Sequence, residues 1–151
     1  MFESLEGILI SYGYVGLFLA SFLASTIIPF GSEGLLVLLV YKKFNIPALV
    51  LVASVGNFLG ACTSYYIGLK GRGFVEKYLR FDPKDIEKAE KIFLKYGPFA
   101  LLFTWLPFIG DAITVASGIL RFKFWIFCIL VFTGKFIRYV IIAYSAAVVL
   151  T

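Results

Sequence analysis

The stretch Pro29-Phe30-Gly31-Ser32-Glu33 interrupts a strongly apolar segment, and Pro107-Phe108-Ile109-Gly110-Asp111 interrupts a second one in the same way. In both stretches a carboxylate follows the proline by four residues. Proline ends a helix, and glycine lets the backbone turn tightly. A carboxylate is costly in lipid, so it normally faces protein or water. The two stretches therefore predict the tips of two re-entrant hairpins. The predicted tip residues are Pro29, Gly31, Ser32, Pro107 and Gly110.

The composition predicts an integral membrane protein. Of the 151 residues, 61% are hydrophobic and only 15% are charged. Soluble domains are nearer half apolar and about a quarter charged. We expect a single membrane domain covering residues 1–151, in a prokaryotic plasma membrane. The net charge of +5 indicates membrane topology instead of nucleic-acid binding, because the basic residues lie in short loops beside apolar segments.

The sequence lacks the residues that most catalytic and metal sites need. It contains no histidine, which excludes imidazole-based catalysis and histidine metal ligation. Cys62 and Cys128 each lie in an apolar segment and are interpreted as small buried hydrophobes. We therefore expect no enzyme activity, no metal and no cofactor.

Only some of the apolar segments are long enough to cross a bilayer. Residues 46–69 and 124–150 each predict a full spanning helix. Residues 34–41 span about 12 Å at about 1.5 Å per residue, against a bilayer core of about 30 Å. The segments 99–106 and 112–120 are similarly short. This disfavours the alternative of four or more ordinary spanning helices.

Residues 70–95 have a different character, because they contain eight basic and five acidic residues. Asp82-Pro83 predicts the start of a helix, with aspartate as its cap. Apolar residues follow at helical spacing: Ile86, Ala89, Ile92 and Phe93. This pattern predicts an amphipathic helix that lies on the membrane surface.

The two halves of the chain overlay when one is shifted by 78 residues. Pro29 then falls on Pro107, and Lys43 falls on Arg121. We interpret this as an internal repeat: repeat one covers about 8–69, the linker 70–95, and repeat two about 96–150. Each repeat would be a hairpin followed by one crossing, so the second would be inserted upside down. The predicted fold class is an all-α membrane protein with an inverted repeat, an arrangement typical of secondary transporters.

The distribution of basic residues predicts the orientation of the chain. Residues 70–96 and 121–123 hold ten of the fourteen Lys and Arg residues, whereas the other side has only Lys42 and Lys43. Because basic loops stay inside, we expect the 70–95 loop to be cytoplasmic and both termini to be outside.

Four charged residues are predicted to meet at mid-membrane depth. Lys135 and Arg138 lie eleven and fourteen residues after Phe124, a rise of about 16–21 Å, and they share a helix face. The tip acids Glu33 and Asp111 are expected at the same depth. Two readings stay open: the charges are ion pairs that dock the hairpins, or they line a cavity for an anionic headgroup. In the cavity, the acids could carry a proton or hold the bases in place.

Asn57 completes the predicted substrate or proton site of Glu33, Asp111, Lys135 and Arg138. It falls on Lys135 in the repeat, so it offers a neutral polar group where the other half offers a cation.

The chain resembles the DedA family, also called the VTT or SNARE-associated domain family, and most of all its short YqaA-like branch. The resemblance rests on the Pro29–Glu33 stretch, Trp105-Leu106-Pro107 with Gly110-Asp111, and Gly134-Lys135 with Arg138-Tyr139. It implies two facing re-entrant hairpins and a role in flipping undecaprenyl phosphate or scrambling phospholipids, in some members with proton coupling.

The chain also departs from the family pattern. It has Ala24 and Ala61 where the typical family has acids, and Thr104 and Gly110 where it has arginines. Of those charges only Glu33 carries over, which makes Asp111, Lys135 and Arg138 a relocated charge set.

The predicted function is a lipid or lipid-phosphate translocase whose partners are membrane lipids with anionic headgroups. The alternatives are a proton- or ion-coupled transporter of a small polar solute and a non-transporting membrane scaffold. The sequence is also compatible with a homo-oligomer.

Overall fold

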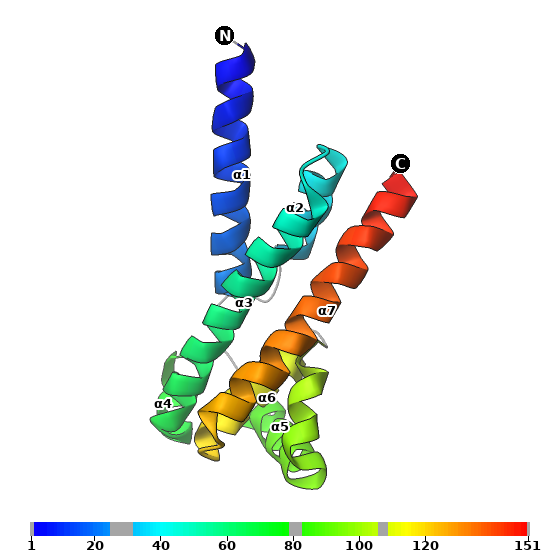
Figure 1. The fold of residues 1–151 in the computed structure, drawn as a ribbon. Coiled ribbons are helices and arrows are strands. Elements are labelled where there is room, and N and C mark those ends of the chain that lie inside the picture. Colours follow the sequence, from blue (N-terminus) through cyan, green and yellow to red (C-terminus); the bar gives the residue numbers. More distant parts are fainter. Residues whose placement is uncertain (1, 25–31, 79–82, 106–108, 151) are drawn as a thin grey trace.

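The computed structural model describes residues 2–24, 32–78, 83–105 and 109–150, and within these ranges the chain forms helices and short connections without a strand (Figure 1). This confirms the predicted all-α class. The elements are α1 (Phe2–Ala24), α2 (Ser32–Tyr41), α3 (Ile46–Leu69), α4 (Arg72–Tyr78), α5 (Pro83–Tyr96), the 3-10 helix η1 (Gly97–Trp105), α6 (Ile109–Ile119) and α7 (Phe124–Leu150).

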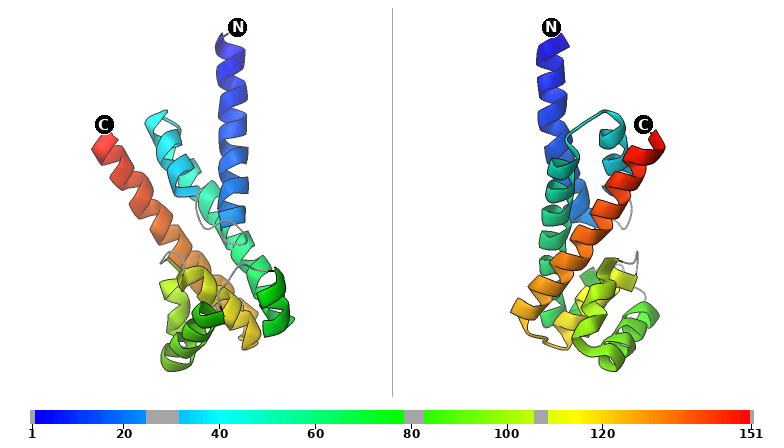
Figure 2. Two further views of the ribbon diagram at one scale, coloured as in Figure 1. Left: turned by 180° about the vertical axis from the view of Figure 1, so that it is seen from behind. Right: turned by 45° about the vertical axis from the view of Figure 1, so that its right-hand side comes forward.

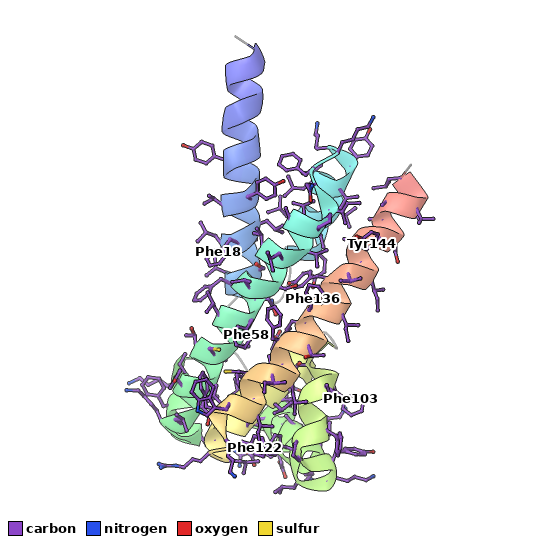
Figure 3. The ribbon with its side chains drawn as sticks, in the orientation of Figure 1. Phe18, Phe58, Phe103, Phe122, Phe136 and Tyr144 are labelled. Carbon is purple, nitrogen blue, oxygen red and sulfur yellow. The ribbon has the colours of Figure 1, made fainter. Side chains whose placement is uncertain are left out.

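Helices α3 and α7 are long and apolar enough to span a membrane, at 24 and 27 residues. Their bounds coincide with the predicted segments 46–69 and 124–150. Helix α3 starts where Asn45 accepts a hydrogen bond from the Ala48 amide at 3.0 Å, a normal N-cap. The two helices pack against each other, and Figure 3 labels Phe58 on α3. Its ring meets that of Phe132 of α7 edge to face, with ring centroids 5.5 Å apart.

One short helix from each half of the chain packs on the long helix of the other half, an arrangement called crosswise packing below. Helix α6, from the second half, packs on α3, whereas α2, from the first half, packs on α7. Helix α1 also packs on α3, and η1 packs on α7. Both termini lie at one end of the molecule and α4 and α5 at the other (Figures 1 and 2). Each long helix is therefore covered by elements from both halves.

The turns that end α2 and α6 have the same geometry. Lys43 and Arg121 both have positive φ, at 65° and 55°. The amide of Phe44 donates to Leu39, and that of Phe122 donates to Ser117, at 3.1 and 3.0 Å. This bonding pattern ends helices with a left-handed residue. The equivalent residues are 78 apart, so the same structural unit occurs at the positions that the repeat pairs.

Glycine at either left-handed position should stabilise the protein. L-residues pay about 1 kcal/mol for left-handed backbone, so Lys43→Gly and Arg121→Gly should each raise the free energy of unfolding by up to that amount. Thermal unfolding in detergent micelles measures the change. Lys42→Gly, one residue earlier and without a positive φ, is the control and should give no gain. An equal gain at position 42 would contradict the turn geometry.

The linker helix differs from the prediction in what covers its apolar face. Helix α5 is amphipathic, but Ile86, Ala89 and Phe93 are buried inside the protein. Ile86 packs with Val75 and Val115, and the other two join a core cluster with residues of η1 and α6. The amphipathic helix is confirmed and its apolar face packs against protein, whereas its position on the membrane surface stays a prediction. The exposed face carries Lys84, Lys88, Lys91 and Lys95.

Two further expectations about the second half need correction. The apolar arm predicted at 99–106 is the 3-10 helix η1, which begins at Gly97 with φ 63° and ends at Trp105. Helix α6 begins at Ile109, three residues before the arm predicted at 112–120. Gly110 and Asp111 therefore lie in its first turn, just as Ser32 and Glu33 open α2. Helix α4 was not predicted.

Candidate functional site

Glu33 and Asp111 occupy equivalent places in two short helices. Each carboxylate lies in the first turn, of α2 and α6 respectively. The first N–H groups of a helix lack intrahelical partners, and the helix dipole is positive at this end. Both effects favour an ionised carboxylate at these positions.

Asp111 is paired with Lys135 of α7. The Lys135 Nζ atom donates to Asp111 Oδ1 at 3.0 Å. The Lys135 side chain is 0% exposed and that of Asp111 14% exposed. Gly134 allows this burial, because a Cβ there would lie 3.1 Å from Thr104 Oγ1 and 3.3 Å from the Leu102 carbonyl of η1. The pair joins α6 to α7 in a place that η1 covers closely.

Glu33 is paired with Arg138, one turn further along α7. The Arg138 Nη2 atom contacts Glu33 Oε1, and the guanidinium lies over the Tyr139 ring at 5.6 Å from its centroid. The two side chains are 13% and 30% exposed. This pair joins α2, from the first half of the chain, to α7, from the second.

The structure thus brings four of the predicted site residues into two neighbouring ion pairs. Lys135 and Arg138 are three residues apart, about 4.5 Å along the helix axis. Two acids and two bases neutralise each other near the middle of α7, which lowers the cost of keeping charge among apolar helices. Their role as a substrate or proton site stays a prediction.

Asn57 is oriented toward another neighbour. It is 2% exposed, and its Nδ2 atom donates to the Ser21 carbonyl of α1 at 2.9 Å. Its Oδ1 atom and the Oγ atom of Ser54, one turn earlier, are buried without a hydrogen-bond partner among the residues that the structure describes. The contacts of Asn57 therefore hold α1 to α3 and do not reach the ion pairs. Ser54 was not predicted as a site residue, although its spacing of three residues from Asn57 indicates a shared helix face.

The predicted tip residues are only partly visible. Pro29, Gly31 and Pro107 lie outside the described residues, as does Asp82. Ser32 is the first residue of α2. A Cβ on Gly110 would overlap the Thr104 carbonyl.

The crowding around Gly110 explains one departure from the family pattern. Thr104 is buried and donates to the Leu101 carbonyl at 2.7 Å. Neither Thr104 nor Gly110, where the resemblance implies arginines, has room for so large a side chain in this packing. The cations of the site come from α7 instead.

Two threonine hydroxyl groups donate to the backbone of their own helices. Thr114 donates to the Asp111 carbonyl at 2.7 Å, and Thr63 donates to the Leu59 carbonyl at 3.0 Å. Within the described ranges no three Cys, Asp or Glu side chains gather as a metal site would require. The site therefore offers charged side chains for binding: the carboxylates of Glu33 and Asp111 and the cations of Lys135 and Arg138.

Comparisons with known proteins agree with the resemblance in the sequence. The family model described as "VTT domain" matches residues 4–148. An uncharacterised protein of Haemophilus influenzae is 36% identical over 135 residues, covering 82% of this chain and 81% of the relative. Inner membrane protein YqaA of Escherichia coli is 35% identical over 128 residues, covering 84% and 86%.

A protein of Lactococcus lactis subsp. cremoris is also similar. It bears the name "Alkaline phosphatase-like protein" and is 30% identical over 164 residues, covering 97% of this chain and 76% of the relative. No solved structure matches the chain.

Proposed function

Because this chain belongs to the VTT domain family, also called the DedA family, we propose that it moves membrane lipids or lipid phosphates across the bilayer. The headgroup passes the charged residues between the two short helices while the acyl chains stay in the bilayer. The relatives include an inner membrane protein of Escherichia coli, and two helices of this chain are long and apolar enough to span a membrane.

The observation that carries the proposal is the set of two ion pairs at mid-length of α7. Ion pairs in an apolar environment stabilise a fold poorly compared with apolar packing. Two such pairs within one helical turn, in a chain with only 15% charged residues, favour a functional reason for keeping them. Guanidinium and ammonium groups at this depth suit an anionic headgroup.

Crosswise packing supports an inverted repeat with two re-entrant hairpins. Helices α2 and α6 are 10 and 11 residues long, too short to span a bilayer. Each packs on the long helix of the other half, and each ends in the same left-handed turn. Two units related by a two-fold axis in the membrane plane would place their acids near one another, as transporter repeats do.

Lipid movement in reconstituted liposomes tests the proposal. Fluorescent lipid that becomes accessible to dithionite reports the rate of transbilayer movement. Arg138→Ala should slow it by roughly thirtyfold, because a hydrogen bond to a charged group contributes about 2 kcal/mol. Glu33→Ala should also change the rate.

The control for this assay is Lys88→Ala, which removes an exposed lysine of α5 far along the chain from the site. It should move lipid like the wild type. If Arg138→Ala and Glu33→Ala also match the wild type, the proposed site is wrong. If the wild type moves no lipid but carries a small polar solute, the solute-transporter alternative replaces the proposal.

A further inference from the structure

The two ion pairs of the site differ in accessibility. The Lys135 and Asp111 side chains are 0% and 14% exposed, whereas those of Arg138 and Glu33 are 13% and 30% exposed. Both cations lie on the same face of α7, one turn apart. The two pairs therefore lie close together along α7 and differ in how far they are exposed.

In the more buried pair, Lys135 has little freedom to exchange Asp111 for another anion. Gly134 brings α7 against the Thr104 hydroxyl and the Leu102 carbonyl, which seals the segment that carries Lys135. A ligand could reach this ammonium only if the surrounding helices moved, because the Lys135 side chain is fully buried. Losing Asp111 would also leave a buried charge without compensation, which is strongly unfavourable. Lys135 and Asp111 therefore form a fixed contact between α6 and α7.

In the more exposed pair, Arg138 is a cation that can bind other anions besides Glu33. A guanidinium has five N–H donors, and Arg138 contacts Glu33 through Nη2. Arginine binds carboxylates and phosphates with the same two-pronged geometry. Glu33, when released, stays at the helix N-terminus of α2, which favours a carboxylate even without the arginine. An incoming phosphate can thus replace the carboxylate without leaving an isolated buried charge.

We propose that a phosphate group displaces Glu33 from Arg138 while the contact between Lys135 and Asp111 stays closed. The phosphate is either part of a lipid headgroup or a free anion. In this scheme Glu33 stays paired with Arg138 whenever the ligand is absent, and ligand binding breaks this contact between α2 and α7. This proposal rests on the proposed function for the position of the ligand. It adds that the two ion pairs have different roles: Lys135 and Asp111 hold α6 on α7, whereas Arg138 exchanges Glu33 for the ligand.

Phosphate titration of the full-length protein in a nonionic detergent tests this scheme. Inorganic phosphate and a short-chain phosphatidylglycerol are titrated separately, with thermophoresis as the readout. Glu33→Gln should bind phosphate roughly tenfold more tightly, the effect expected for removing one adjacent charge. Glu87→Gln, which neutralises an exposed carboxylate of α5 outside the site, should not change the affinity, and Arg138→Gln should lose binding. Unchanged affinity in Glu33→Gln, or equal tightening in Glu87→Gln, would overturn the scheme.

Chemical labelling of the wild-type protein tests the same scheme without depending on the folding of a variant. Phenylglyoxal followed by peptide mass spectrometry should modify Arg138, and phosphate should protect it. An amine reagent should leave Lys135 unlabelled with or without phosphate. Phosphate that fails to protect Arg138, or labelling of Lys135 at the rate of the exposed Lys88, would contradict the division between the pairs.

These results are separable from the liposome assay. If phosphate binding follows the expected pattern but no lipid moves, the proposed function fails and the exchange at Arg138 stands. If lipid moves but Glu33→Gln binds phosphate no better, the exchange fails and the proposed function stands. Binding of inorganic phosphate without binding of the phospholipid supports the exchange and assigns the ligand as a free anion.

Discussion

Asp111→Leu is expected to destabilise the protein by about 3–5 kcal/mol, the usual cost of leaving one buried charge of an ion pair without its partner. Lys135 is fully buried, so its ammonium cannot turn to water when Asp111 is removed. The double variant Asp111→Leu with Lys135→Met removes both charges and should recover most of the loss. Unfolding in mixed detergent micelles gives the free energies for the single and double variants.

The matched control for this prediction is the other pair. Glu33→Leu leaves Arg138 with a side chain that is 13% exposed and lies on the Tyr139 ring. Its loss of stability should be clearly smaller than that of Asp111→Leu. Equal losses from the two single variants would mean that both pairs are covered to the same extent and would remove the basis for exchange at Arg138.

The sequence predicts the long helices to the residue because their limits depend on local chemistry. Asn45 and Pro47 open α3, and apolar length alone distinguishes it from the short arms. The four site charges were predicted to be neighbours because all of them were expected at the same membrane depth. The cations lie near the middle of α7, and the acids lie near the predicted hairpin tips. Which acid pairs with which base depends on the crosswise packing of α2 and α6, which no local pattern encodes.

Two contacts that differ from those expected share one physical cause. Helical periodicity in α5 shows that Ile86 and Phe93 are covered, but it does not distinguish lipid from protein as the covering material. The same limit applies to Asn57: the repeat pairs it with Lys135, yet its amide donates to Ser21 of α1. Position in a repeat predicts the helix face of a residue, whereas its partner depends on side chains that differ between the halves.

A methyl group at Gly118 should separate α3 from α6. A Cβ on Gly118 would overlap the Tyr65 carbonyl, and a Cβ on Gly68 would overlap the Val115 carbonyl. Both obstacles are main-chain atoms of helices, which cannot move aside as a flexible side chain can. Overpacking usually costs about 1–3 kcal/mol, so we expect Gly118→Ala to reach the upper part of that range. Thermal unfolding in detergent micelles measures the loss.

The effect should extend to the site, because α6 carries Asp111 at its other end. Moving α6 away from α3 shifts the carboxylate relative to Lys135, so Gly118→Ala should also slow lipid movement in the liposome assay. Gly34→Ala is the control: it adds the same methyl group to α2, where nothing lies within 4 Å. Because alanine favours helices over glycine by about 1 kcal/mol, that variant should be slightly more stable than the wild type. A Gly118→Ala protein as stable as Gly34→Ala would show that α3 and α6 do not touch at these glycines.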